Sequence, residues 1–157
     1  ALAQFTSGRC VERAELEAMI VASLPPIVVG LSRKCAPVLS AGATLRNGSA
    51  LAARYRADAD RAWPAAKAAF QRVSDVELPS FLDPSTLQTV AGEVVAGAVV
   101  EGIATSDCAL LDRAVTAMQP LPARNVGQLA AVAYEAAAER RRDLPFTICT
   151  AAGGAAR

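Results

Sequence analysis

The chain contains no histidine among its 157 residues, and only 4% of them are aromatic. Without histidine it cannot build a Ser-His-Asp or Cys-His catalytic site, or the H-E-x-x-H zinc motif. We also find no P-loop and no G-x-G-x-x-G fingerprint in the sequence. These absences predict a protein that is not an enzyme and holds no cofactor and no metal.

Charge of one sign is also missing, because 16 basic residues face 15 acidic ones for a net charge of +1. Such a chain has no overall field that would attract nucleic acid or an anionic membrane. Its most basic run, Glu139 to Asp143, is short and flanked by acids. The macrodipole of a helix favours positive charge at its C-terminus, which explains the run without a ligand. An anion or partner contact is the second interpretation, and we predict no nucleic-acid partner.

No continuous apolar run reaches the roughly 18 to 20 residues that span a bilayer. The longest candidate, Val90 to Ile103, is interrupted by Glu93 and Glu101, so we predict no membrane span. The chain begins Ala-Leu-Ala without a methionine. We expect an exported protein whose signal peptide has been removed, with an artificially trimmed chain as the alternative.

Alanine dominates what is present, and it is the strongest helix former. The sequence therefore predicts an all-α fold, a single domain over residues 1–157 with an irregular bundle of five to six helices and frayed tails at about 1–6 and 150–157. We expect the helices at 8–23, 25–35, 51–73, 84–103, 108–118 and 125–141.

Prolines set most of these predicted boundaries. Leu24-Pro25-Pro26 predicts the end of one helix and the first turn of the next. Pro64 lies inside an apolar stripe that keeps its phase on both sides, which favours one kinked helix over two. Asp83-Pro84 is a typical cap followed by a first-turn proline.

The helix predicted at 84–103 is apolar around most of its circumference. A helix of that kind, too short to span a membrane, is usually the central one of a bundle. Its small residues, such as Gly92 and Ala96, would let neighbouring helices approach closely.

Four cysteines, an even number, suit an exported protein with two disulfides. Cys108 sits at a predicted helix start, where a thiol pKa is lowered, but a catalytic thiol needs a base that the chain lacks. No C-x-x-C pair supports a metal site. The disulfide interpretation is therefore preferred for Cys108, and with it for Cys10, Cys35 and Cys149.

The pairing we favour is Cys10–Cys35 with Cys108–Cys149. It assumes that two short helices fold back on each other at Pro25-Pro26, and that the segment after residue 145 returns to the start of the helix at 108–118. Each bridge would then contribute about 3 to 4 kcal/mol by restricting the unfolded chain.

Two groups of residues are candidates for a site. Glu93 and Glu101 lie eight residues apart on one side of a helix and could serve as a pair of acids in a pocket. A solvent-facing polar stripe is the preferred interpretation of the same pair. Asn47-Gly48-Ser49 matches a glycosylation sequon, a short match that is common by chance and is read here only as a turn.

The function that we predict is a non-catalytic binding or interaction module of the bacterial periplasm or cell exterior, with an unidentified protein partner. The alternative is a carrier of a small apolar ligand in a helical cavity. Core packing is the preferred role of Trp63, while the candidate lining of that cavity is Trp63, Phe70, Met118 and Tyr134. A hydrolase that uses Glu93 and Glu101 is the least favoured hypothesis.

Overall fold

The computed structural model describes residues 10–73, 80–144 and 146–149, and within them the fold is all-α, as predicted. A pair of two-residue parallel strands, β1 and β2, joins the two ends of the described chain. The predicted frayed tails lie outside the described residues. The elements, in chain order, are β1 (Cys10–Val11), α1 (Arg13–Cys35), η1 (Ala36–Val38), η2 (Thr44–Asn47), α2 (Gly48–Val73), α3 (Pro84–Glu101), η3 (Thr105–Asp107), α4 (Cys108–Met118), α5 (Ala123–Arg140) and β2 (Thr147–Ile148).

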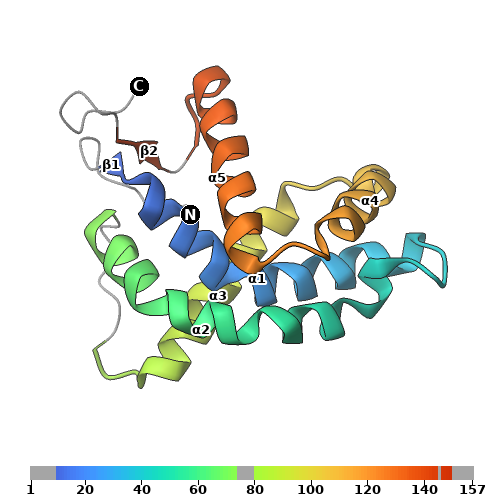
Figure 1. Ribbon diagram of the computed structural model, residues 1–157, viewed down its shortest axis with the longest axis horizontal. Coiled ribbons are helices and arrows are strands. Elements are labelled where there is room, and N and C mark those ends of the chain that lie inside the picture. Colours follow the sequence, from blue (N-terminus) through green and yellow to red (C-terminus); the bar gives the residue numbers. More distant parts are fainter. Residues whose placement is uncertain (1–9, 74–79, 145, 150–157) are drawn as a thin grey trace.

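The central element is α1, against which α2, α3 and α5 all pack (Figure 1). Ten of its 23 residues are buried, among them Leu16, Val28 and Leu31. The prediction that the helix at 84–103 would be central is wrong. Only three residues of α3 are buried, and its outward side is apolar but exposed.

Pro25 and Pro26 lie inside α1 rather than between two helices, so the predicted break is wrong. A proline inside a helix costs about 3 kcal/mol. Burying an aliphatic side chain contributes about 1.5 to 3 kcal/mol, and Val28 and Leu31 in the following turns are both buried. Burial on the far side of the two prolines thus offsets their cost and keeps the helix continuous.

Because α1 continues through its prolines, the segment Arg13–Val38 is long and apolar enough to cross a membrane by length and composition. The expectation that Val90 to Ile103 would be the longest apolar candidate is therefore corrected. Half of the most apolar stretch of Arg13–Val38 is buried inside the fold, and the core helix of a soluble protein passes the same test. The absence of a membrane span stays a prediction.

Close helix contacts in this fold are made at glycines. A Cβ at Gly92 of α3 would lie 2.9 Å from Cγ of Pro26, and one at Gly30 of α1 would lie 2.9 Å from Cγ2 of Val100. A Cβ at Gly127 of α5 would lie 2.7 Å from a methyl group of Val21. At each of these glycines, a side chain of the neighbouring helix occupies the space that a Cβ would need. For Gly92 this confirms the prediction that the small residues of 84–103 let neighbouring helices approach closely.

Helix α2 is continuous through Pro64, which confirms one helix instead of two. Its ribbon changes direction in its second half (Figure 1). Trp63 is 8% exposed and packs in the core with Ala66 and Val73, as preferred from the sequence. Asp83 caps α3 as predicted, because its side chain accepts a hydrogen bond from the backbone N–H of Thr86 at 2.9 Å.

The structure has two disulfides, as predicted, but the predicted pairing is wrong. Cys10 bonds Cys149, and Cys35 bonds Cys108. The prediction failed because it required a turn at Pro25-Pro26. The 23 residues of continuous α1 hold Cys10 and Cys35 about 35 Å apart at about 1.5 Å per residue. Each cysteine instead meets a cysteine that is brought to its own end of α1.

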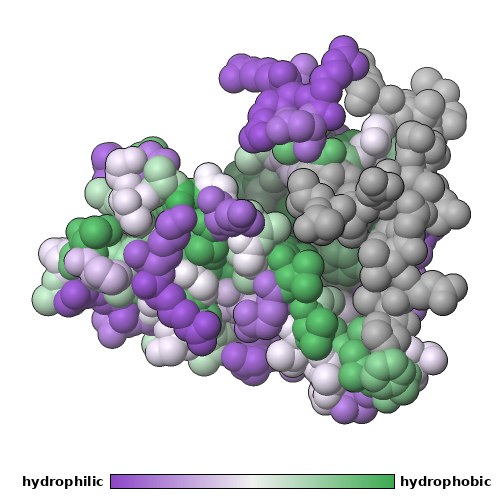
Figure 2. Space-filling model, turned by 180° about the vertical axis from the view of Figure 1, so that it is seen from behind, coloured by the Kyte–Doolittle hydropathy of each residue, from purple (hydrophilic) through white to green (hydrophobic). Residues whose placement is uncertain are grey.

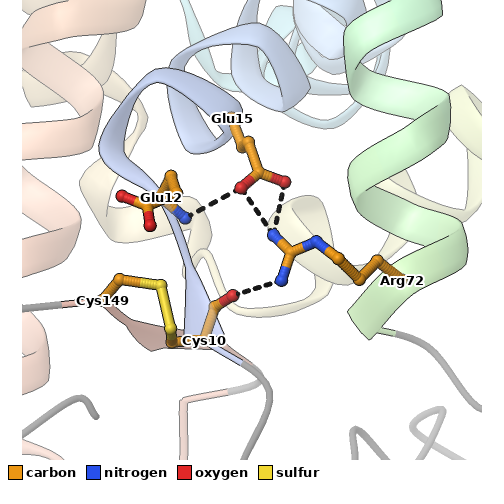
Figure 3. The surroundings of a disulfide bond; sticks show 5 residues. All are labelled: Cys10, Glu12, Glu15, Arg72 and Cys149. Carbon is orange, nitrogen blue, oxygen red and sulfur yellow. Dashed lines mark hydrogen bonds and ion pairs between the residues drawn. A yellow bond between two sulfur atoms is a disulfide. The ribbon is translucent and has the colours of Figure 1, made fainter. Parts of the chain in front are cut away.

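Polar contacts surround the Cys10–Cys149 disulfide (Figure 3). The Arg72 guanidinium, from the last turn of α2, donates to the backbone carbonyl of Cys10 at 2.8 Å and to the carboxylate of Glu15. Glu15 also accepts a hydrogen bond from the backbone N–H of Glu12, as part of a capping box at the start of α1. These contacts join α1, α2 and β1 beside the bridge.

Candidate functional site

Three of the four residues predicted to line a cavity lie in one core cluster. Trp63, Phe70 and Tyr134 pack there, whereas Met118 packs in the other cluster around Cys35 and Cys108. Within the first cluster, the rings of Phe70 and Tyr134 lie 6.5 Å and 6.4 Å from that of Phe146, measured between centroids. The four side chains are thus split between two cores.

Tyr134 fixes the segment before β2. Its hydroxyl accepts a hydrogen bond from the backbone N–H of Phe146 at 2.8 Å and donates one to the carbonyl of the same residue at 3.0 Å. Partial burial raises the pKa of Tyr134, because the charged phenolate would lose its water. We read these contacts as structural, since both partners are backbone groups of this chain.

The structure has a surface hollow of about 270 Å³ at another place, between η2, the start of α2 and the end of α4. Its lining includes Thr44, Leu51, Arg54 and Gln119, and none of the four predicted cavity residues lines it. The Arg54 guanidinium donates to the backbone carbonyl of Gln119 at 2.7 Å, so this cation already has a partner in the fold. The carrier hypothesis gains no support from this hollow and stays a prediction.

Glu93 and Glu101 are both exposed on α3, which is what the solvent-facing interpretation expects. Between them on the same side of the helix lies Gly97, at which an added Cβ would meet no atom within 4 Å. The two carboxylates therefore border open surface. Neither side chain is buried, and burial is one of the conditions that suit a carboxylate to acid–base work.

Exposed apolar residues occupy the same outward side of α3. Val90 is 47% exposed and Val94 is 69% exposed, although both carry branched aliphatic side chains. The sequence shows that this helix is apolar around most of its circumference, and from this we predicted that it lies at the centre of the fold. The signal that could have corrected this is the pair Glu93 and Glu101, which mark the outward side.

A second exposed apolar face belongs to α5, where Leu129 is 54% and Val132 is 59% exposed. Figure 2 shows the molecule from the side on which α3 lies. Hydrophobic surface crosses the centre of this view, and polar surface caps the C-terminal end of α5 above it. That polar end is the predicted basic run, in which the Arg141 guanidinium pairs with the Asp143 carboxylate at 2.7 Å.

In the part of the chain that the structure describes, no three acidic, cysteine or histidine side chains come together to hold a metal ion. The described cysteines are all in disulfides. Comparisons with models of protein families, with curated proteins and with solved structures found no match for this chain. The candidate site therefore rests on the exposed apolar faces of α3 and α5.

Proposed function

We propose that this protein is a non-catalytic interaction module that works in the periplasm or at the cell exterior, and that it binds its partner through the outward face of α3. The observation that carries the proposal is the exposure of Val94, at 69%, beside Val90, at 47%, on a helix whose inner side is packed. Exposed apolar side chains that cluster on one face are typical of interaction sites.

The rigidity of the support favours binding as well. Helix α3 is held on α1 by the contact of Gly92 with Pro26 and by the contact of Gly30 with Val100. The Lys34 ammonium group also donates to the carbonyl of Val100 at 2.9 Å, close to the end of α3. A face that is fixed before binding loses little conformational entropy when a partner docks.

The proposed location rests on the two disulfides, which are compatible with an oxidising compartment. It is tested by the intact mass of protein isolated from its native host, measured after alkylation with and without prior reduction. We expect no alkylated cysteine before reduction. Four alkylated cysteines in the unreduced protein would contradict an exported location.

The binding proposal is tested by placing a photo-crosslinking residue at Val94 and, as a matched control, at Ala57, an exposed position of α2. We expect a discrete crosslinked product from position 94 in the native compartment and none from position 57. A Val94→Arg substitution should remove the partner from a pull-down, and Ala57→Arg should not. Equal products from both positions would overturn the assignment of the α3 face.

A further inference from the structure

We propose that the partner of the α3 face is a helix of another polypeptide, with one apolar side that is flanked by lysines or arginines. This inference rests on the proposed function, because it names the chemistry of the partner that docks on the same face. Three properties of the face support it: the sign of its charges, an open space near its centre, and the spacing of the carboxylates around that space.

Every charged residue of α3 is acidic. The helix contains two glutamates, Glu93 and Glu101, and no lysine or arginine. Asp83 at its cap adds a third carboxylate, and all three residues are exposed. Lys34 of α1 lies near the end of the helix, where its ammonium group donates to the carbonyl of Val100. A face with charges of this sign attracts cationic groups and disfavours anionic lipid and nucleic acid.

The glutamates border the exposed valines of the same face. Val90 precedes Val94 by one turn, Glu93 is the neighbour of Val94 in the chain, and Glu101 follows Val94 by two turns on the same side. A partner that covers the two valines with apolar side chains therefore brings its flanking side chains beside carboxylates. Cationic flanking side chains are the ones that this arrangement favours.

The space in front of Gly97 suits an apolar side chain of the partner. The other glycines inside the described helices are Gly30, Gly48, Gly92 and Gly127, and at each of them a Cβ would lie 2.9 Å or less from a side chain of another helix. At Gly97 a Cβ would meet nothing within 4 Å. Glycine destabilises a helix relative to alanine, and the described fold does not use the space that Gly97 leaves. We therefore assign that space to the partner.

The spacing around Gly97 predicts a pattern in the partner. Glu93 lies four residues before Gly97 and Glu101 lies four residues after it. Residues four apart lie on the same side of a helix, about 6 Å apart along its axis. A helix laid along α3 keeps the same spacing. It matches the face with an apolar residue level with Gly97 and with a lysine or arginine four residues before and four residues after that residue.

The exposed apolar face of α5 does not have this pattern. The side of α5 that carries Leu129 and Val132 ends in the neutral Asn125 and in Glu139 beside Arg140. Two α3 faces do not match either, because acids would oppose acids. We therefore assign the α3 face to a different polypeptide instead of a second copy of this chain.

The experiment uses a synthetic helix as the probe. It is as long as α3, with leucines on one side and lysines on both flanks of that side, and we call it the Leu/Lys helix. The control probe, the Leu/Glu helix, has glutamate in place of each lysine. Fluorescence anisotropy measures the binding of each probe to the whole oxidised chain. We expect the Leu/Glu helix to bind at least about tenfold more weakly, and added salt to weaken binding of the Leu/Lys helix.

A pair of double variants tests the charges of the face. Glu93→Gln with Glu101→Gln should weaken binding of the Leu/Lys helix about fivefold, because it removes two exposed charge pairs. The matched control is Glu139→Gln with Asp143→Asn, which removes two exposed carboxylates at the polar end of α5. It changes the net charge of the chain equally and should keep the affinity within about twofold.

Two substitutions of Val94 separate the sign of the charge from the loss of the apolar contact. Val94→Arg and Val94→Glu both remove the exposed valine, but arginine repels a cationic partner and glutamate attracts it. Val94→Glu should therefore bind the Leu/Lys helix about tenfold more tightly than Val94→Arg. The opposite order would overturn a basic partner.

A further variant tests the shape of the face. Gly97→Leu meets open space within its own chain and improves helix propensity, so the fold and its melting temperature should be kept. It should still weaken binding of the Leu/Lys helix about tenfold, because it fills the space that a leucine of the probe needs.

The inference is overturned if the two probes bind alike, if the Leu/Lys helix does not bind, or if neither the glutamate variant nor Gly97→Leu weakens its binding more than the control does. Crosslinking from position 94 separates this inference from the proposed function. A crosslinked peptide that belongs to a second copy, or that lacks the basic–apolar–basic spacing, overturns the basic partner and leaves the proposed function standing. A crosslinked peptide with that spacing supports both.

Discussion

The two disulfides hold the two ends of α1 in different ways. Cys35 and Cys108 are 0% and 1% exposed and belong to the hydrophobic core, where they join α1 to the start of α4. Cys10 and Cys149 are only partly buried, and they join β1 to the residue after β2, beside the ion pair of Arg72 with Glu15. One bridge is therefore part of a packed interior, while the other clamps a segment that has little interior of its own.

Loop length and burial predict opposite orders for the stability that the two bridges contribute. The Cys10–Cys149 bridge, which we call the outer bridge, spans 139 residues, and the Cys35–Cys108 bridge, the inner bridge, spans 73. Chain entropy alone therefore favours the outer bridge by less than about 1 kcal/mol. Burial favours the inner bridge, because its removal also leaves space in a packed core. We expect burial to decide the order.

The largest effect is expected from the double substitution Cys35→Ala with Cys108→Ala. It should lower the free energy of unfolding by about 4 kcal/mol, through the lost restriction of the unfolded chain and the lost packing of two buried sulfurs. Chemical denaturation monitored by circular dichroism measures this change. A loss no larger than that of the outer-bridge variant would break the ranking by burial.

Cys10→Ala with Cys149→Ala is expected to cost less, about 2 kcal/mol, because residues 146–149 of the folded chain gain freedom when the bridge is removed. The bridge that contributes less to stability should also be the first to be broken by a mild reductant. A thiol reductant reaches the partly exposed bridge first, so alkylation followed by peptide mass analysis should find Cys10 and Cys149 modified before Cys35 and Cys108. Simultaneous modification of all four would show that access does not separate the bridges.

Near the inner bridge, Asp112 of α4 accepts a hydrogen bond from the backbone N–H of Leu45 at 2.8 Å, and Leu45 is 0% exposed. Asp112→Ala leaves this buried N–H without its acceptor and should cost about 1.5 kcal/mol. Asp112→Asn, whose amide oxygen can still accept, is the matched control and should retain most of the stability. Equal losses from both variants, measured by chemical denaturation, would mean that the negative charge matters more than the hydrogen bond.

At the outer end, Tyr134→Phe removes both hydrogen bonds to Phe146 and should cost about 1 kcal/mol. The variant also tests a pH dependence. Since burial raises the pKa of Tyr134 above its ordinary value of 10.0, its contribution is complete below that value and is lost as the pH rises through the raised pKa.

We expect the stability of the unsubstituted chain to fall at high pH, and Tyr134→Phe to reduce the slope of that fall. Tyr55, whose pKa burial also raises, accounts for part of what remains. Thermal melts from neutral to strongly alkaline pH measure both slopes. Identical slopes would remove Tyr134 from the explanation.

The sequence predicted those features that depend on local chemistry. The fold class follows from alanine, the start of α3 follows from Asp83-Pro84, and the unbroken α2 follows from a stripe that keeps its phase across Pro64. Each of these depends on residues that lie within a few turns of one another.

The sequence did not predict what depends on burial between distant segments. Pro25 and Pro26 were read as a break because their local cost is large, whereas the burial of Val28 and Leu31 by other helices is not visible locally. The wrong disulfide partners followed from that one error, since a hairpin was needed to bring Cys10 to Cys35. Tertiary packing overrode local propensity at this point.

The candidate site was missed for a related reason. Val90 and Val94 were read as core because apolar residues surround α3, and only the structure shows which side α1 covers. Glu93 and Glu101 were recognised, and a solvent-facing stripe was the preferred interpretation of the pair, but the valines beside them were still placed in the core. A charged residue on an otherwise apolar helix is better interpreted as marking the side of the helix that faces solvent.

The two bridges are nested, because Cys35 and Cys108 both lie between Cys10 and Cys149. A single cut of the backbone anywhere from residue 10 to residue 149 therefore leaves one covalently joined molecule. Even two cuts, one between residues 35 and 108 and one between 108 and 149, give three pieces that sulfur atoms still hold together. Resistance of this kind to loss of fragments would suit a molecule that meets peptidases outside the cell.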